Sequence, residues 1–216
     1  MTRLEIRNKF RVENPEITSR VITDAQLNEF CEAGDLEICC ISRCIMSNES
    51  EIISSVVNLQ YYDLETQIDK FYDIDDMPGG GVYYNDLPLK KTSLSEMNYT
   101  KPRWKTASAG TPKKFWRRGK YLWLDVKPAT ADLEIAVDCV YIPDPFDADD
   151  KEPFNEIGSL QPYAEAIIKY LQWRCKQKIG KHDEAAIAEK DYSAYVNWMK
   201  KRVSAAKYSA VYIKPA

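Results

Sequence analysis

A stripe of apolar residues at helical spacing marks the first regular element of the chain. The stripe comprises Leu27, Phe30, Cys31, Gly34, Ile38, Ile41 and Ile45. The preceding Thr23-Asp24-Ala25-Gln26 is a capping-box pattern, which is typical of a helix start. Residues three and four positions apart lie on one face of a helix, so this long apolar face must be buried against other helices.

Between residues 48 and 157 the helical spacing gives way to short runs that are typical of strands. Such runs, rich in β-branched or aromatic residues or alternating between apolar and polar, occupy 53–61, 67–72, 82–84, 114–117, 121–126 and 133–141. In the last run, Ile135 and Val137 share one face while Glu134 and Asp138 share the other, which predicts a half-buried antiparallel strand. A second capping-box pattern at residues 93–96 predicts one or two helical turns.

Two further apolar stripes predict a pair of helices near the end of the chain. The first helix begins near Pro162 and stops at Gly180, residues suited to a helix start and a helix end. The second runs from 183 to 206. Their apolar faces are Ala164, Ile167, Ile168, Leu171 and Cys175 in the first, and Ala188, Tyr192, Tyr195, Val196, Met199 and Val203 in the second. Because the connection is short, the two helices should pack antiparallel.

These elements predict an α+β fold: a helical bundle, made of the first helix and the C-terminal helix pair, with an inserted antiparallel β-rich module. The bundle takes residues 21–47 and 158–206, and the module takes residues 48–157. Residues 1–20 are expected to form an extended arm, since Pro15 argues against a continuous helix, and residues 207–216 a tail. The expected bundle core is Leu27, Phe30, Ile38, Ile41, Ile167, Leu171, Tyr195 and Met199.

Length and charge narrow the class of protein. A chain of 216 residues suits one domain, or one domain with an insertion. The net charge of −3 argues against a polyanion binder that acts through bulk charge. No uncharged apolar window approaches the length of a membrane span, and the first residues do not resemble a signal peptide. We therefore expect no membrane partner, and a protein that stays in the compartment where it is made.

The cysteines indicate packing rather than disulfides or metal. Four of the six, Cys31, Cys39, Cys40 and Cys44, fall within the first predicted helix, where they suit small apolar residues in a reducing cytoplasm. The alternative is a metal site at Cys40 and Cys44, which are four residues apart. No CxxC pair is present, however, and the single histidine, His182, is distant in sequence. No metal or other cofactor is expected.

Other candidate chemistry lacks the required context. The triple glycine at 79–81 is not part of a GxxxxGK[ST] motif, so we interpret it as a loop tip. Paired carboxylates at 63–65, 73–76 and 147–150 fall in predicted loops, where solvated charge is the simpler interpretation. No GxSxG motif is present, and His182 is expected at the surface near a helix start.

One basic stretch carries the main functional question. Residues 101–120 hold eight Lys or Arg and no acid, interleaved with Trp104, Phe115 and Trp116, which is a composition typical of nucleic-acid surfaces. The alternative, favoured by the negative net charge, is that these cations face acidic loops such as 144–152, in the same fold or in a neighbouring subunit. The candidate basic edge is Lys113, Lys114, Arg117, Arg118 and Lys120.

Several phrases, in their order, resemble the head-to-tail adaptor (connector) proteins of tailed bacteriophages. The phrases are ITDAQLNEFCEAGDLEI at 22–38, YDL at 62–64, GTPKKFWRRGKYLWLDVKP at 110–128, VYIPDPF at 140–146 and LQPYAEAIIKYLQWRCKQ at 160–177. Each is degenerate alone, and the likeness covers about residues 20–206. The N-terminal arm and the triple-glycine loop have no counterpart in this pattern.

The resemblance implies a virion structural protein with the fold predicted above and no enzymatic activity. Such proteins form a ring, usually of twelve subunits, that lies below the portal, extends the DNA channel and docks the tail. The implied partners are the portal protein, the tail or a second adaptor or nozzle protein, and further copies of the chain. The implied location is the head–tail connector region of the virion, with the host cytoplasm during assembly. The portal-docking tail maps to Tyr208, Val211, Tyr212 and Ile213.

Within that interpretation the basic edge has two possible roles. It pairs with an acidic patch on the next copy in the ring, or it touches passing genomic DNA without reading its sequence. The alternative function is a nucleic-acid-binding module that uses the surface of residues 101–120. A hydrolase with an unrecognised carboxylate site has no positive support in the sequence.

Overall fold

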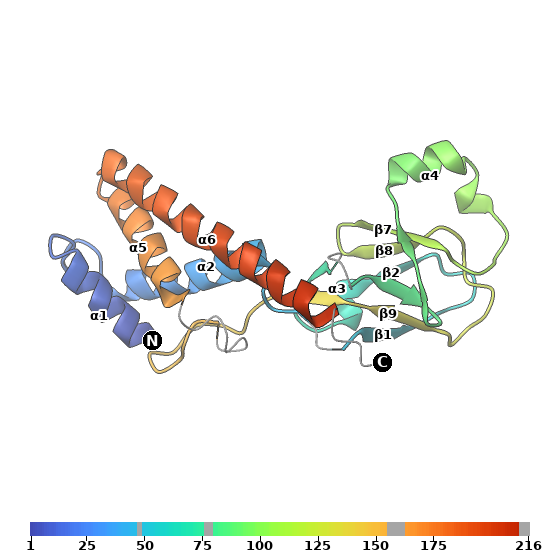
Figure 1. Cartoon of the computed structure of the whole chain (residues 1–216), viewed down its shortest axis with the longest axis horizontal. Helices are drawn as coiled ribbons and strands as arrows, with labels where there is room; N and C mark the ends of the chain where they lie inside the picture. Colours follow the sequence, from blue (N-terminus) through green and yellow to red (C-terminus); the bar gives the residue numbers. More distant parts are fainter. Residues whose placement is uncertain (47–48, 76–79, 155–162, 212–216) are drawn as a thin grey trace. The chain divides into compact units, whose positions relative to one another are not determined.

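In a computed structural model the chain divides into two compact units, a helical unit (Met1–Ile45 with Ile142–Ala216) and a β module (Met46–Tyr141) (Figure 1). The structure describes residues 1–46, 49–75, 80–154 and 163–211, with side chains described through residue 205. The prediction of an α+β fold with a β module inserted into a helical bundle is confirmed. The compact β unit ends at Tyr141, because residues 142–154, which follow it, belong to the helical unit; the predicted boundary at 157 lies outside the described residues.

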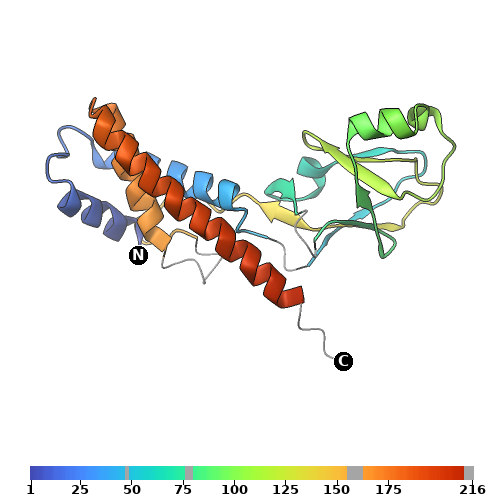
Figure 2. The same cartoon turned by 45° about the horizontal axis from the view of Figure 1, so that its top comes forward.

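The helical unit contains α1 (Arg3–Glu13), α2 (Asp24–Ser42), α5 (Ala164–Lys178) and α6 (His182–Val211). The predicted capping box is present, since the side chains and backbone groups of Thr23 and Gln26 are reciprocally hydrogen-bonded. Helices α5 and α6 lie side by side across a short turn at Gly180, whose φ of 78° suits glycine, and α2 packs against both (Figures 1 and 2). The stripe on α2 is therefore covered by the C-terminal helix pair, as predicted.

The prediction of an extended N-terminal arm is wrong, because residues 3–13 form α1. Thr2 and Glu5 make a second capping box, and Ile6 and Phe10, four residues apart, are fully buried. Pro15 does not interrupt this helix, since it follows the C-cap residue Asn14. The apolar pair thus adds a fourth helix to the bundle.

Two arginines fix α1 to the segment that follows the β module. Arg3 Nε and Arg7 Nη2 each lie 3.1 Å from a carboxylate oxygen of Asp149. Arg3 is buried and also donates to Glu32 and to the backbone carbonyl of Phe146. The hydrogen bonds from Arg7 and then from Arg3 lower the pKa of Asp149. Much of the acidic loop 144–152 therefore serves the helical unit and not the basic stretch of the β module.

The bundle core agrees with the sequence at most positions. Leu27, Ile38, Ile167, Leu171 and Met199 are buried, while Phe30 and Tyr195 are half-buried. Ile41 was expected in the core but is 38 % exposed, because Ile38, Cys39 and Ser42 form the buried face of the last turn of α2. Helix α6 also continues to Val211, beyond the expected end at 206.

Two four-stranded sheets form most of the β module. The first sheet has the order β1 (Glu51–Ser54), β9 (Glu134–Val137), β4 (Val82–Tyr84), β5 (Leu87–Pro88), and the second has β2 (Tyr61–Asp63), β8 (Tyr121–Leu124), β7 (Lys114–Arg118), β6 (Lys90–Lys91). A further pair joins β3 (Phe71–Ile74) to β10 (Cys139–Tyr141). Short helices at α3 (Leu64–Gln67), α4 (Leu94–Thr100) and η1 (Trp104–Thr106) complete the module. The strand pairs are antiparallel except for β6 with β7.

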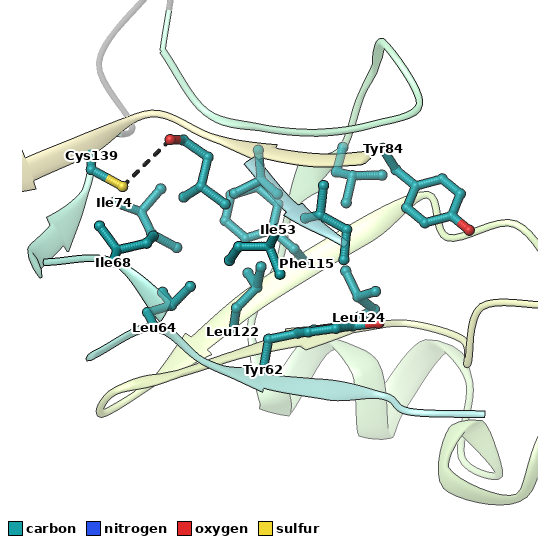
Figure 3. Close-up of a cluster of buried hydrophobic side chains, with 14 of the residues drawn as sticks. Ile53, Tyr62, Leu64, Ile68, Ile74, Tyr84, Phe115, Leu122, Leu124 and Cys139 are labelled. Carbon is teal, nitrogen blue, oxygen red and sulfur yellow. Dashed lines mark hydrogen bonds between the residues drawn. The ribbon is translucent and has the colours of Figure 1, made fainter. Parts of the chain in front are cut away.

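The larger hydrophobic core of the module lies between the inner faces of the two sheets (Figure 3). The first sheet contributes Ile53, Val82, Tyr84, Ile135 and Val137, and the second contributes Tyr62, Phe115, Leu122 and Leu124. The predicted alternation at 133–141 is present, but the run is broken at Asp138 into β9 and β10, which join different sheets. Asp138 stabilises this break, because its carboxylate accepts hydrogen bonds from Ser50 Oγ at 2.6 Å and from the amide of Gly81 at 2.8 Å.

Five of the six cysteines pack as small buried side chains, as the sequence predicts. All six are free thiols, and all but Cys40 are buried. Burial raises the pKa of Cys31, Cys139 and Cys175 to about 12 in each case. Among the residues that the structure describes, no group of three His, Cys, Asp or Glu side chains could hold a metal ion.

Because α2 and α5 pack closely at Gly34, a larger side chain at this position should destabilise the fold. A Cβ there would lie 2.9 Å from Cδ1 of the buried Tyr170. Helix propensity alone favours valine over glycine, yet Gly34→Val should lower the free energy of unfolding by about 1–3 kcal/mol through overpacking. Ala33→Val, at the exposed neighbouring position, should cost less than about 0.7 kcal/mol. Urea unfolding followed by far-UV circular dichroism measures both, and equal effects would contradict this packing.

The Asp149 contacts predict a pH-dependent component of stability. Because the folded-state pKa of Asp149 lies below its unfolded value of about 3.9, this contribution is present above that value and is lost as pH falls through the folded value. Asp149→Asn should therefore lower the urea midpoint at pH 7, and its difference from wild type should shrink towards pH 3. Asp150→Asn, at an exposed neighbour, is the control and should match wild type. A difference that is independent of pH would contradict the assignment.

Candidate interaction surface on the β module

The basic stretch ends in a hairpin made of β7 and β8, which turns at Gly119 with φ of 58°. The register pairs Trp116 with Trp123 and Arg118 with Tyr121. Because paired residues share a face and neighbours along a strand alternate, these four side chains lie on the outer face of the second sheet. Phe115, Leu122 and Leu124 lie on the inner face, in the core. The hairpin therefore has one core face and one outward face.

Helix α4 and η1 cover part of the outer face with an aromatic cluster. Trp104 packs edge-on against Trp116, with ring centroids 4.8 Å apart, and Met97 completes the buried cluster. Trp116 and Trp123 are stacked at 6.0 Å with an interplanar angle of 14°. Ser93 caps α4 as the sequence predicts, by accepting from the amide of Glu96. The aromatic residues that suggested base stacking, Trp104, Phe115 and Trp116, are each no more than 3 % exposed, so their rings are occupied within the fold.

Three of the five residues of the basic edge are paired inside the module. Lys114 Nζ lies 3.3 Å from Glu96, and Lys120 Nζ lies 2.7 Å from Asp63. Arg117 pairs with Asp73 and donates to the carbonyls of Tyr72 and Gly119. The hydrogen bond to Asp63 raises the pKa of Lys120. These cations thus face acids, but the acids belong to the β module and not to residues 144–152.

The other two residues of the basic edge, Lys113 and Arg118, are not paired in this way in the described part of the chain. Lys113 and Arg118 are exposed, and neither side chain makes an ion pair with any residue in the described ranges. Arg118 lies beside a groove of about 730 Å³, to which Lys91 and Arg117 also contribute, together with Asp73. The edge therefore offers two available cations rather than five.

Asp125 is a structural anchor of this region that sequence analysis missed. Its buried carboxylate accepts hydrogen bonds from the amides of Lys113 at 2.8 Å and Lys114 at 3.1 Å, and lies 3.9 Å from Lys101 Nζ. The position after a short strand carries no signal that separates such an anchor from a solvated turn residue. Asp125 fixes the start of β7 and so determines where Lys113 projects.

A half-exposed aromatic surface was also missed. Tyr61 is 45 % exposed, and its ring lies 4.9 Å from Trp123 and 5.7 Å from Tyr121. We call Tyr61, Tyr121 and Trp123 the aromatic face. The alternation in Tyr121-Leu122-Trp123-Leu124 could have revealed it, because one pair had to face outward. The indole Nε1 of Trp123 has no hydrogen-bond acceptor among the described residues.

The other candidate residues belong to the helical unit or lie outside the described residues. The backbone at Tyr208 and Val211 belongs to the last turns of α6, and Tyr212 and Ile213 lie outside the described residues. Gly79 of the triple glycine also lies outside them. His182 is exposed at the first residue of α6. The structure thus brings together the basic edge and the aromatic residues, while the docking of the tail stays a prediction.

No protein-family model matches the chain, and no curated protein matches it at a significant level. Within the described part of the chain, no helix combines the length and apolar character that a membrane span requires.

Neighbouring arginines on β7 should differ in their effect on stability. Arg117→Ala removes hydrogen bonds to Asp73 and to two carbonyls, and also the contact of the guanidinium with the Phe71 ring. It should lower the free energy of unfolding by about 1.5–3 kcal/mol. Arg118→Ala should change it by less than about 0.5 kcal/mol. Chemical unfolding followed by tryptophan fluorescence measures both, since three of the five tryptophans lie in the module, and a larger loss at Arg118 would contradict the assigned pairing.

Proposed function

We propose that this chain is a head-to-tail adaptor: a virion structural protein that forms a ring below the portal, extends the DNA channel and docks the tail. The observation that carries the proposal is the order of the elements. A capped helix, an inserted β module and a closely connected helix pair follow one another, as the resemblance implies. The ring, which the resemblance sets at about twelve copies, would be made of this chain alone.

The arrangement of acidic residues supports a structural rather than a catalytic role. Asp63, Asp73 and Asp149 come from the three groups of paired carboxylates that the sequence singled out. Each binds a Lys or Arg of its own unit. Carboxylates that hold lysines and arginines in place stabilise the fold, whereas acid–base catalysis requires them to face a substrate.

The length of α6 supports a docking role for the C-terminus. Helix α6 has 30 residues and is about 45 Å long, whereas its partner α5 has 15 residues. Only part of α6 can therefore pack against α5. The docking segment proposed from the sequence, Tyr208 to Ile213, begins on the last turns of this helix. A long helix of this kind would carry an apolar tail to a second protein.

The alternative nucleic-acid-binding function gains no support from the geometry. The three aromatic rings of residues 101–120 are buried, and the edge retains Lys113 and Arg118 as available cations. Arg103 and Lys105 of the same stretch are also exposed, but cations without exposed rings in that stretch suit contact with a DNA backbone better than a dedicated binding site.

The proposal is tested by mixing the purified chain with the portal protein of the same genome. Mass photometry and negative-stain imaging should show a ring of this chain on the portal, and no association at any ratio would contradict the proposal. Tyr212→Ser with Ile213→Ser should weaken portal association about tenfold or more, because two large apolar side chains lose their burial. Lys214→Ser is the control and should have little effect. Association through an apolar tail should persist at high salt, whereas binding through DNA should not.

A further inference from the structure

We propose that neighbouring copies of this chain join head to tail through opposite faces of the β module. The outer face of the first sheet of one copy would contact the aromatic face of the next. This inference rests on the proposed ring and assigns the surfaces that build it.

The outer face of the first sheet carries a row of apolar side chains that crosses all four strands. The register aligns Ile52 with Ala136, Ala136 with Tyr83, and Tyr83 with Pro88. Their neighbours along the strands, among them Ile53, Ile135 and Tyr84, point into the core. The row must therefore point outward. Ile52 is 55 % exposed, Pro88 is exposed, and Tyr83 and Ala136 are half-buried. We call these four residues the apolar row.

The apolar row and the aromatic face lie on opposite sides of one module. The core between the two sheets is filled from both inner faces, so the two outer faces point away from each other (Figures 1 and 3). Both strips combine apolar or aromatic side chains with a polar rim, which is the composition of protein–protein interfaces. A surface that binds its own copy on one side only would give a closed dimer, whereas two complementary surfaces give a head-to-tail chain of copies. Such a chain forms a ring where the rotation between copies closes, and the proposed ring requires that closure.

The charges at the rims of the two strips have opposite signs. Beside the apolar row, Glu134 projects outward from β9, and Asp86 and Asp132 are exposed at turns that flank β4 and β9. Beside the aromatic face, Arg118 is exposed on β7 and makes no ion pair among the described residues, whereas Lys120 at the turn is held by Asp63 of the same face. An acidic rim against a basic rim selects the head-to-tail arrangement, because two like faces would repel. This complementarity is the reason to assign a second copy of the chain as the partner. In this arrangement the next copy covers Arg118, so of the two available cations of the basic edge Lys113 is left for contact with passing DNA.

The test uses full-length chains that are blocked on one face only. Ile52→Lys places a cation in the apolar row, opposite the basic rim, and Tyr61→Glu places an anion in the aromatic face, opposite the acidic rim. Both positions are about half exposed, so the module should still fold, as circular dichroism and tryptophan fluorescence will verify. Val12→Lys, at an 81 % exposed position of the helical unit, is the control. Should either blocked chain fail to fold, Ser54→Lys and Arg118→Glu replace them at exposed positions of the same faces.

Sedimentation velocity over a concentration series, without and with the portal protein, measures the self-association of each chain. Each blocked chain should lose at least tenfold in self-association relative to wild type, and the control should not. Mixing the two blocked chains should restore association in a 1:1 ratio, because the intact apolar row of one meets the intact aromatic face of the other.

Three results would overturn the inference: wild-type assembly by either blocked chain, blocked chains that form stable homodimers, or mixing that restores nothing. A Tyr61→Glu chain that loses single-stranded DNA binding but keeps its assembly would assign the aromatic face to nucleic acid instead. A wild-type chain that stays monomeric both alone and with the portal would overturn the inference together with the proposed ring. If mixing the two blocked chains restores association but the chain does not bind the portal, the head-to-tail contact is supported and the adaptor function is contradicted.

Discussion

The apolar face of α2 is the constraint on which the rest of the chain depends. A helix of 19 residues with Leu27, Cys31 and Ile38 fully buried cannot be stable alone in water, and its partners α5 and α6 lie at the other end of the sequence. Folding the helical unit therefore requires the two ends of the chain to meet. Everything between residues 46 and 141 must then leave the unit and return to it, and the β module satisfies this condition with its own core.

Many charged side chains pair with opposite charges of their own unit. These pairs determine which charged residues are left to bind a partner. The basic stretch appears in the sequence as a uniform band of eight cations. In the fold, Lys114, Arg117 and Lys120 hold acids of the same module, while Asp149 holds arginines of α1. The cations that the module can offer to a partner are therefore the few that do not pair with its own acidic side chains. The total number of cations matters less.

Much of the fold could be predicted because periodicity and caps are local. Residues close together in the sequence determine the capping box at Thr23, the C-terminal helix pair and the alternation at Ile135 and Val137. Helix α1 was missed although Thr2 and Glu5 carry the same box, because Pro15 was given too much weight. Arg117 is paired and Arg118 is not because Asp73, which is distant in sequence, binds only Arg117 of the two. The break in the strand at Asp138 likewise depends on the distant Ser50. A single sequence does not reveal such pairings, and the same reason hid the aromatic face.

The bridge between Met46 and Val140 has a consequence for how such a protein can evolve. It holds the segments that enter and leave the β module side by side, at the boundary where the helical unit ends. An insertion whose two ends are already adjacent can be lengthened, shortened or exchanged without moving the helices that carry it. Selection can thus reshape the module for new neighbours as a cassette, while the four-helix scaffold keeps its own packing.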